Sequence, residues 1–273
     1  MPRKILVGLN GSEYSLAAMD YAIALSAKHG ASLVGLGIVD EPHLTAPEPV
    51  PLGAGAFKEE RDVAVVQAAH AKIDQVLREF EHRCQAAGVY PVSEKRIGDP
   101  VEILAHQAQR CDLLVVGKRH VLEDEWDRSS HTLDQLLRHS PRPVVSVPKA
   151  RNNETPVLVA YDGSMQAART LQAFVESGLG ADRELHVASL GGHAQDDAVL
   201  AKEFLNAHML TPRLIIEESE AQPVKRLLAI AQQLQAGLIV LGCYGQPRLK
   251  EFFFGSVTKG ILAESSVPLF LYH

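Results

Sequence analysis

Glycine and hydroxyl residues gather near the C-terminal end of the chain at a spacing that suits an anion. Gly242 and Gly245 follow an apolar run, and after nine more residues Gly255 and Ser256 open a helical pattern. Glycines allow close approach to the backbone, and amides at a helix N-terminus attract oxyanions, which favours phosphate binding at Gly255, Ser256 and Val257. An ordinary turn and helix start would use the same residues, so spacing alone leaves both interpretations open.

Asp162 is the acidic residue that fits such a site. It follows the apolar run 157–161, and the carboxyl ends of parallel strands meet at one edge of a sheet. There it would bind a ribose or a divalent cation next to phosphates. No histidine lies between Gly242 and Tyr272 to act as a general base, and the chain has neither GxxxxGK[ST] nor GxGxxG. We therefore predict a binding site with no catalytic residue.

The segments that would position these residues occur twice in the chain. Residues 5–12 recur as 157–164, and 113–117 recur as 238–242. The offset between the repeats falls from 152 to 125 positions, so the first half is longer by 27 residues. We expect the excess mainly at 41–62, a Pro/Gly-rich stretch that we interpret as a long loop, either a surface insertion or a lid or partner-binding segment.

Short β-branched runs alternate with helical patterns in each half, as in parallel α/β sheets. The expected strands lie at 4–9, 32–39, 92–96, 113–117, 143–147, 156–161, 184–190, 213–217, 237–241 and 267–272. The expected helices lie at 14–29, 62–87, 100–110, 130–139, 165–178, 194–208, 223–235 and 256–264. We predict an α/β fold of two tandem, doubly wound, parallel five-stranded sheets that are Rossmann-like. The domains would be 1–148 and 156–273, joined by a linker at 149–155.

Composition narrows the class of protein. The 273 residues are 46% hydrophobic and carry a formal charge of −6, which argues against an extended basic surface for nucleic acid. No apolar run approaches the roughly 18 residues of a membrane helix, and the start of the chain does not read as a signal peptide, so we expect a cytoplasmic protein. Cys84, Cys111 and Cys243 form no CxxC pair, and the histidines show no metal-binding spacing.

The run 157–164, followed by Gly242-x2-Gly245-x9-Gly255-Ser256, resembles the ATP-binding signature of the universal stress protein family. The resemblance covers both halves, as two tandem domains of an adenine nucleotide α-hydrolase-like fold. It implies a stress-response protein that binds ATP or a related adenine nucleotide and acts through conformation or partners. Asp162 would meet Mg²⁺ only through the bound nucleotide.

The resemblance also assigns the contacts by position. The base and ribose would lie against Ala160, Tyr161 and Asp162, with Leu190 beside the adenine. Leu241 and Gly242 would continue the wall of the site. The phosphates would be held by Gly245, Gly255, Ser256 and Val257. Two departures from the family pattern are Tyr161, which would crowd the pocket, and Gly237, which stands where the family has Asp.

The first half departs further. At an offset of 125, His120 and Ser130 stand at the second and third glycine positions and His131 at the serine position, while Asn10 replaces the Asp. Side chains there would strain the backbone and fill phosphate space. Residues 121–135 carry a charge of −4, against +2 for the equivalent 246–260, and like charge repels a polyphosphate. We predict one nucleotide site, in the second half; the first would be a structural partner, or bind another ligand through its histidines.

Partners follow from the architecture that the resemblance implies. The last strands of the two halves, 143–147 and 267–272, would pair edge to edge, so that one chain forms an intrachain pseudo-dimer. A homodimer of such chains stays open. Two other functions also stay open: a slow ATPase or another enzyme acting on adenine nucleotides, and a scaffold that binds no nucleotide because Tyr161 blocks the adenine.

Overall fold

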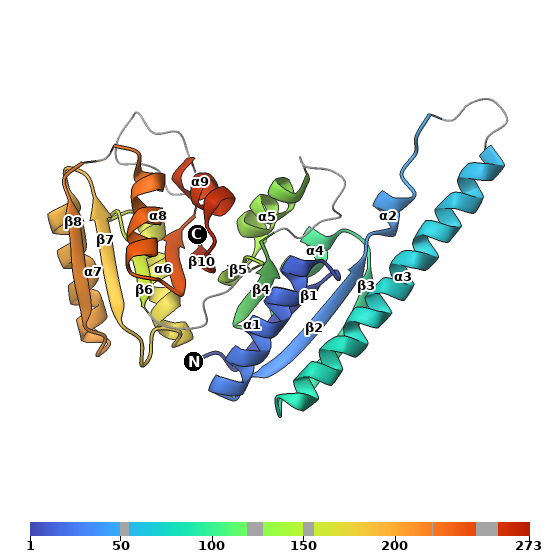
Figure 1. Cartoon of the computed structure of the whole chain (residues 1–273), viewed down its shortest axis with the longest axis horizontal. Helices are drawn as coiled ribbons and strands as arrows, with labels where there is room; N and C mark the ends of the chain where they lie inside the picture. The colour runs from blue at the N-terminus through green and yellow to red at the C-terminus, as the bar shows by residue number, and fades with distance from the viewer. Residues whose placement is uncertain (50–54, 119–127, 150–155, 220, 244–255) are drawn as a thin grey trace. The chain divides into compact units, whose positions relative to one another are not determined.

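The computed structural model describes residues 1–49, 55–118, 128–149, 156–219, 221–243 and 256–273, without the side chains of 128–131 and 256. The chain divides into two compact units. The N-terminal unit comprises Arg3–Cys111 and Val115–Pro141, and the C-terminal unit comprises Met1–Pro2, Asp112–Leu114 and Arg142–His273. Figure 1 shows strands and helices alternating along the chain in both.

The N-terminal unit is a parallel sheet with helices packed on it, in the strand order β3-β2-β1-β4. Its strands are β1 (Lys4–Leu9), β2 (Ser32–Val39), β3 (Pro91–Ile97) and β4 (Leu113–Gly117). Its helices are α1 (Glu13–His29), α2 (Glu41–Leu44), α3 (Gly55–Ala86), α4 (Pro100–Ala108) and α5 (Arg128–His139). The strands and helices expected for this unit are thus present close to their expected bounds, except that α3 begins well before residue 62 and α2 was not expected.

The C-terminal unit has the strand order β5-β10-β9-β6-β7-β8. Its strands are β5 (Val144–Val147), β6 (Val157–Ala160), β7 (Leu185–Leu190), β8 (Pro212–Glu217), β9 (Leu238–Gly242) and β10 (Leu269–Tyr272). Its helices are α6 (Met165–Ser177), α7 (Ala194–Ala207), α8 (Pro223–Gln233) and α9 (Ser256–Glu264). Neighbouring strands are parallel except β5 and β10, which run antiparallel with Phe270 opposite Val145. This confirms the expected pairing of the last strands of the two repeats.

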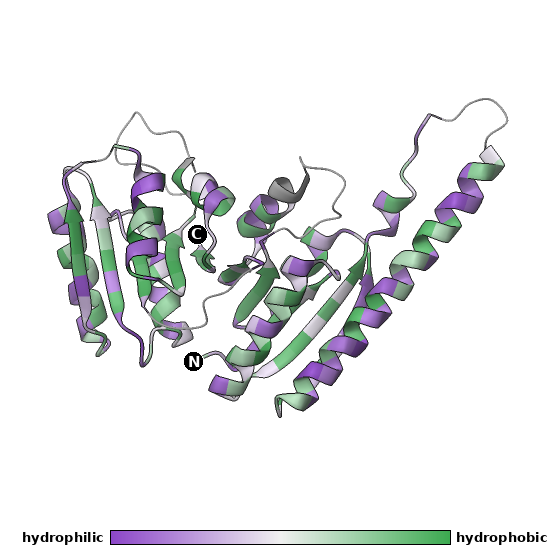
Figure 2. Ribbon diagram, viewed as in Figure 1, coloured by the Kyte–Doolittle hydropathy of each residue, from purple (hydrophilic) through white to green (hydrophobic). Residues whose placement is uncertain are grey.

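The core of each unit lies between its sheet and its helices. The inner strands are nearly continuous apolar runs, coloured green in Figure 2, because both sheet faces are covered there, whereas the edge strands β3 and β8 carry charged residues and are partly exposed. In the N-terminal unit, α3 packs closely on β2 because Gly35 and Gly37 leave room for larger side chains. A Cβ on Gly35 would lie 2.4 Å from the Phe80 ring, and a Cβ on Gly37 would lie 2.5 Å from Ile73.

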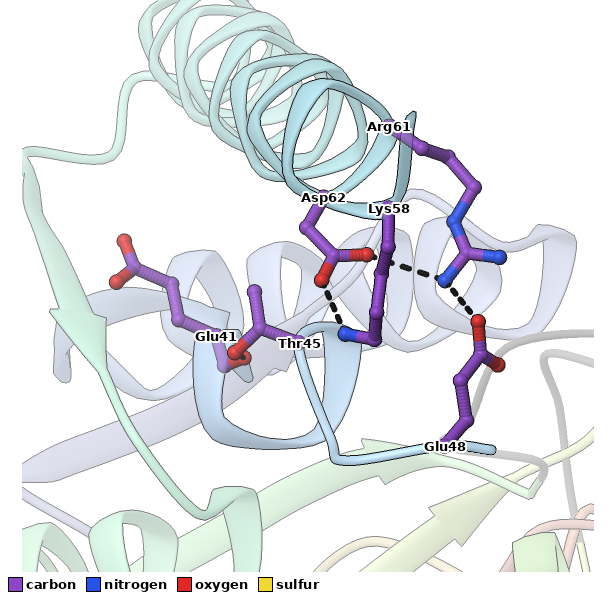
Figure 3. Close-up of polar contacts among 6 residues, drawn as sticks. All are labelled: Glu41, Thr45, Glu48, Lys58, Arg61 and Asp62. Atoms are coloured by element: carbon purple, nitrogen blue, oxygen red, sulfur yellow. Dashed lines mark hydrogen bonds and ion pairs between the residues drawn. The ribbon is translucent and has the colours of Figure 1, made fainter. Parts of the chain in front are cut away.

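The interpretation of 41–62 as one long loop is wrong for much of that stretch. Residues 41–44 form α2, and α3 begins at Gly55, well before the expected residue 62. The first turns of α3 are rich in Ala, Lys, Glu and Arg, which favour a helix, and Lys58 pairs with Asp62 one turn on. Arg61 also contacts Glu48 at 2.5 Å, which ties the segment after α2 to the helix (Figure 3).

Candidate functional site

Three neighbouring strands of the C-terminal unit end at the same edge of the sheet. β6 lies between β9 and β7, with Ala160 opposite Leu241 on one side and Ala188 on the other. Because the strands are parallel, the residues predicted from their ends, Ala160, Leu190, Leu241 and Gly242, come together at this edge. Leu241 is buried, whereas Ala160, Leu190 and Gly242 are partly exposed. The structure therefore gathers the predicted wall residues from three separate parts of the sequence.

The turn after β6 presents the carboxylate of Asp162 at this edge. Its Oδ1 accepts a hydrogen bond from the backbone N–H of Ser164 at 3.0 Å, which closes an Asx turn. Ser164 then caps α6, because its hydroxyl accepts a hydrogen bond from the N–H of Ala167 at 3.1 Å. The Asp162 side chain is exposed, so one oxygen fixes the turn while the other faces solvent, where it can meet a hydroxyl or a hydrated cation.

Tyr161 is tied into the sheet and is only 9% exposed. Its backbone N–H donates to the carbonyl of Ala188 at 2.9 Å, and its own carbonyl accepts a hydrogen bond from the Ser189 hydroxyl at 2.7 Å. These bonds fix the backbone of Tyr161 at this edge and leave its side chain largely buried; that its ring crowds a bound base stays a prediction.

Close packing against α6 requires a glycine at position 242. A Cβ at this position would lie 2.8 Å from the backbone nitrogen of Ala167, in the first turn of α6. Gly117, the equivalent residue of the first repeat, is equally close to the backbone of Tyr14 in α1. The family resemblance predicts Gly242 in the ligand wall, and the structure adds that this glycine lets the end of β9 approach the first turn of α6.

The start of α9 lies next to the end of β9. The hydroxyl of Thr258 donates to the carbonyl of Gly242 at 3.3 Å, and Val257, in the same first turn, is partly exposed. A helix N-terminus, with its unsatisfied N–H groups, therefore stands at the edge that carries Asp162. Gly245 and Gly255 lie outside the described residues. Ser256 is the first residue of α9, and its side chain is likewise outside them.

The first repeat builds the same turn with a neutral side chain. Asn10 Oδ1 accepts a hydrogen bond from the N–H of Ser12 at 3.0 Å, and Ser12 caps α1. Gly11 has φ of +76°, as Gly163 has +67°. The two turns thus differ in charge and not in conformation. His120 lies outside the described residues, and the side chains of Ser130 and His131 are also not described, so the proposed contacts of the first repeat cannot be placed.

A buried acid next to the turn was missed in the sequence. Asp197 of α7 is 5% exposed, and its Oδ1 lies 2.0 Å from the position of a Cβ on Gly163. In the first repeat, the methylene chain of Lys72 from α3 takes the corresponding place over Gly11, at 2.8 Å. The available signal was helical periodicity, because Asp197 shares the apolar face of α7 with Ala194 and Ala201.

Metal-binding and nucleophilic groups are not gathered elsewhere in the part of the chain that the structure describes. Within it, no three His, Cys, Asp or Glu side chains approach closely enough to hold a metal ion. The three cysteines are buried and form no disulfide bond. Burial, with a smaller contribution from Glu81, raises the pKa of Cys84 to about 11. The Cys84 thiol is therefore protonated and unreactive near neutral pH. No described helix is long and apolar enough to cross a membrane.

Comparison with known proteins agrees with this architecture. The model of the universal stress protein family matches residues 1–148 and 192–273. The chain belongs to the universal stress protein family. Universal stress protein Slr1230 of Synechocystis is 25% identical over 285 residues, which cover 99% of both chains.

Two solved structures share the fold along nearly the whole chain. A universal stress protein from Archaeoglobus fulgidus superposes with a TM-score of 0.75 at 21% identity, covering 99% of this chain and 98% of the other. A protein of unknown function from Pseudomonas aeruginosa PAO1 gives a TM-score of 0.58 at 18% identity, with 99% and 92% covered.

Proposed function

We propose that this universal stress protein binds ATP or a related adenine nucleotide at the carboxyl edge of β9, β6 and β7, and that binding acts through conformation or partners. The observation that carries the proposal is that an exposed Asp162 carboxylate follows β6 at the same sheet edge as the N-terminus of α9, which Thr258 joins to the end of the neighbouring strand β9. An acid can bind the ribose hydroxyls of a nucleotide, and a helix N-terminus can bind its phosphates. Both features lie at this one edge of the sheet.

The residues present fit such a ligand. Asp162 holds one oxygen in the turn and presents the other to solvent, which suits a ribose hydroxyl or a nucleotide-bound Mg²⁺. Leu190 supplies partly exposed apolar surface at the same edge, where the buried Leu241 ends β9, and Val257 lies in the first turn of the helix that would face the phosphates. Gly245, Gly255 and Ser256 complete the proposed cradle by sequence position. Because no described group is placed as a general base, we assign binding and not turnover to this site.

The neutral turn of the first repeat supports one site and not two. Asn10 reproduces the backbone of the Asp162 turn without its charge, and the sequence that follows β4 is acidic where the sequence after β9 is basic. We therefore propose that the N-terminal unit is a structural partner in this chain.

The test is calorimetric titration of ATP with magnesium into the full chain. We expect a stoichiometry of one and at least about a tenfold loss of affinity in Gly255→Asp, because a carboxylate would enter the phosphate site. Ser130→Asp, the same change at the equivalent position of the first repeat, should leave affinity unchanged. Asp162→Asn should also weaken binding while keeping the fold, since Asn10 shows that asparagine supports the turn.

Three other outcomes of these experiments would contradict the proposal, each in a different way. No binding to the wild-type chain would reject the proposal in favour of a scaffold that binds no nucleotide. Loss of binding in Ser130→Asp but not in Gly255→Asp would move the site to the first repeat. Rapid multiple turnovers would favour the enzyme alternative.

A further inference from the structure

The sheet of the C-terminal unit ends in β8, which has a strand on one side only. β8 pairs in parallel with β7, from Pro212 opposite Leu185 to Glu217 opposite Leu190. Among the strands that the structure describes, none lies beyond it (Figure 1). The outer side of such a strand offers N–H and C=O groups to another strand.

Along a strand, the backbone N–H and C=O groups of successive residues point alternately to the two sides. This alternation identifies which residues of β8 direct these groups away from β7. The N–H of Gly191 donates to the carbonyl of Glu217 at 2.7 Å, so the backbone groups of Glu217 face β7. In a parallel ladder alternate residues face the same neighbour, so Arg213 and Ile215 also bond toward β7. Leu214 and Ile216 therefore direct their N–H and C=O groups to the open side.

The centre of this edge lacks the usual protection against another strand. Leu214, Ile215 and Ile216 form an uninterrupted apolar run, and all three are partly exposed. Edge strands are usually guarded by charges in their middle, by bulges or by a covering segment. β8 carries its charges at its ends, on Arg213 and Glu217.

The edge strand of the N-terminal unit shows the contrast. β3 has three consecutive charged residues at its centre, Glu94, Lys95 and Arg96. Glu94 is held by Arg96 at 2.9 Å and by Arg110 at 2.5 Å, so another strand would have to displace or bury this network. The two edge strands are therefore differently suited to pairing.

We propose that β8 is a self-association edge, which pairs antiparallel with β8 of a second copy of this chain about a twofold axis at Ile215. In this register Leu214 lies opposite Ile216 of the second copy, and these outward-facing residues exchange both backbone hydrogen bonds. Ile215 meets Ile215 of the second copy on the axis. The result is a sheet that continues from one copy into the next.

Charge complementarity selects this register. Arg213 lies opposite Glu217 of the second copy, twice in the dimer, as a close cross-strand pair of opposite sign. Within one copy Arg213 contacts Glu184 at 2.8 Å, and Glu217 is paired with Arg226. The contact would join these pairs into a row of alternating charge.

Two neighbouring registers also pair the outward-facing backbone groups of β8, but they lose the pairing of Arg213 with Glu217. A shift of two positions toward the N-terminus places Ile216 opposite Pro212, which has no N–H to donate. A shift of two positions toward the C-terminus places Arg213 opposite Ser219 and Ile215 opposite Glu217. Either shift leaves an apolar residue facing a charged one or removes a hydrogen bond, so the register centred on Ile215 is favoured.

Sedimentation velocity of the full chain tests the proposal. We expect a dimer that forms in the range of about 1–300 µM, since a single strand pair buries little surface. Ile215→Lys places two ammonium groups across the axis and should raise the dimer Kd at least about tenfold. Val92→Lys makes the same kind of change on the edge strand β3 and should have no effect. A monomeric wild-type chain at about 300 µM, or equal loss in Val92→Lys, would overturn the proposal.

Disulfide trapping tests the register without adding charge. Ile215→Cys should form a symmetric intermolecular disulfide on mild oxidation, because non-hydrogen-bonded antiparallel pairs bring Cβ atoms within about 4.5–5.5 Å. Leu214→Cys should not, because its partner in the second copy is Ile216. The three native cysteines are buried and give little background. Equal trapping of both variants, or of neither, would reject this register, with circular dichroism confirming that each variant is folded.

Discussion

At the scale of single residues, the turn after the first strand of each repeat separates the needs of the fold from those of a ligand. Both turns use an Asx side chain to accept a backbone N–H, and a serine to cap the next helix. Neither the acceptance of the backbone N–H nor the helix cap requires a charged side chain, because Asn10 forms the same turn. The turn therefore does not need the charge of Asp162, which supports the proposal that this carboxylate binds a ligand.

Glycine in the second turn is required for two physical reasons. Gly163 has a positive φ, and a Cβ there would collide with the buried carboxylate of Asp197. Gly30, the C-cap of α1, also has a positive φ of +63°, but a Cβ there would meet nothing within 4 Å. Comparing substitutions at Gly163 and Gly30 therefore separates the cost of backbone strain from the cost of steric crowding.

We predict that Gly163→Ala costs more stability than Gly30→Ala. Gly30→Ala should cost about 1–2 kcal/mol from backbone strain alone. Gly163→Ala should cost about 1–3 kcal/mol more, because Asp197 is buried and must shift. Urea unfolding of both variants, followed by circular dichroism, measures the difference. Equal costs would show that Asp197 moves aside freely.

The sequence predicted the exposed residues of the candidate site better than the buried contacts that hold them in place. The position of Asp162 at the sheet edge could be predicted because strand ends have local patterns, whereas the phosphate contacts of Gly245 and Gly255 stay predictions. Asp197 was not found, because its role depends on the packing of α7 over a turn 34 residues earlier in the chain. The contact between Gly242 and Ala167 was missed for the same reason, since a close backbone approach leaves no local pattern beyond the glycine itself.

At the scale of elements, β2 and α3 form a matched pair of surfaces. The small residues Gly35 and Gly37 lie under Phe80 and Ile73, so a helix with bulky side chains can lie close to the strand. The strand itself was predictable from its apolar run. The length of α3 was not, because the Pro/Gly content of 41–62 masked the helix-forming residues after Gly55 and their ion pairs.

We predict strong coupling between Gly35 and Phe80 in a double-mutant cycle. Gly35→Ala should cost about 1–3 kcal/mol by overpacking against the ring. Phe80→Ala should cost about 3–5 kcal/mol, because Phe80 is fully buried and leaves a cavity. The double variant should cost less than the sum, since the new methyl group enters the space left by the ring. Denaturant unfolding of the four proteins measures the coupling.

The matched control is Gly55→Ala at the start of α3, where a Cβ would meet nothing within 4 Å. It should be neutral or slightly stabilising, because alanine favours a helix. Additive costs of Gly35→Ala and Phe80→Ala would contradict the contact.

At the scale of the whole molecule, the second repeat pairs with a strand from the first. β10 lies between β9 and β5, and β5 precedes the second repeat in sequence. The buried residues of β10, Leu269, Phe270 and Leu271, would stand at an open sheet edge if β5 were removed. The repeat seen in the sequence and the compact unit seen in the structure therefore have different boundaries.

We predict that a fragment of residues 156–273 self-associates through β10. Its exposed edge is apolar and already pairs antiparallel with β5 in the full chain, so a second fragment can take the place of β5. The fragment should carry Ile215→Lys, so that association through β8 is suppressed. Sedimentation velocity should then show twice the mass of one fragment. A monomeric 156–273 fragment with native circular dichroism would show that β10 needs no partner on that side, and that β5 joins the C-terminal unit without being required by it.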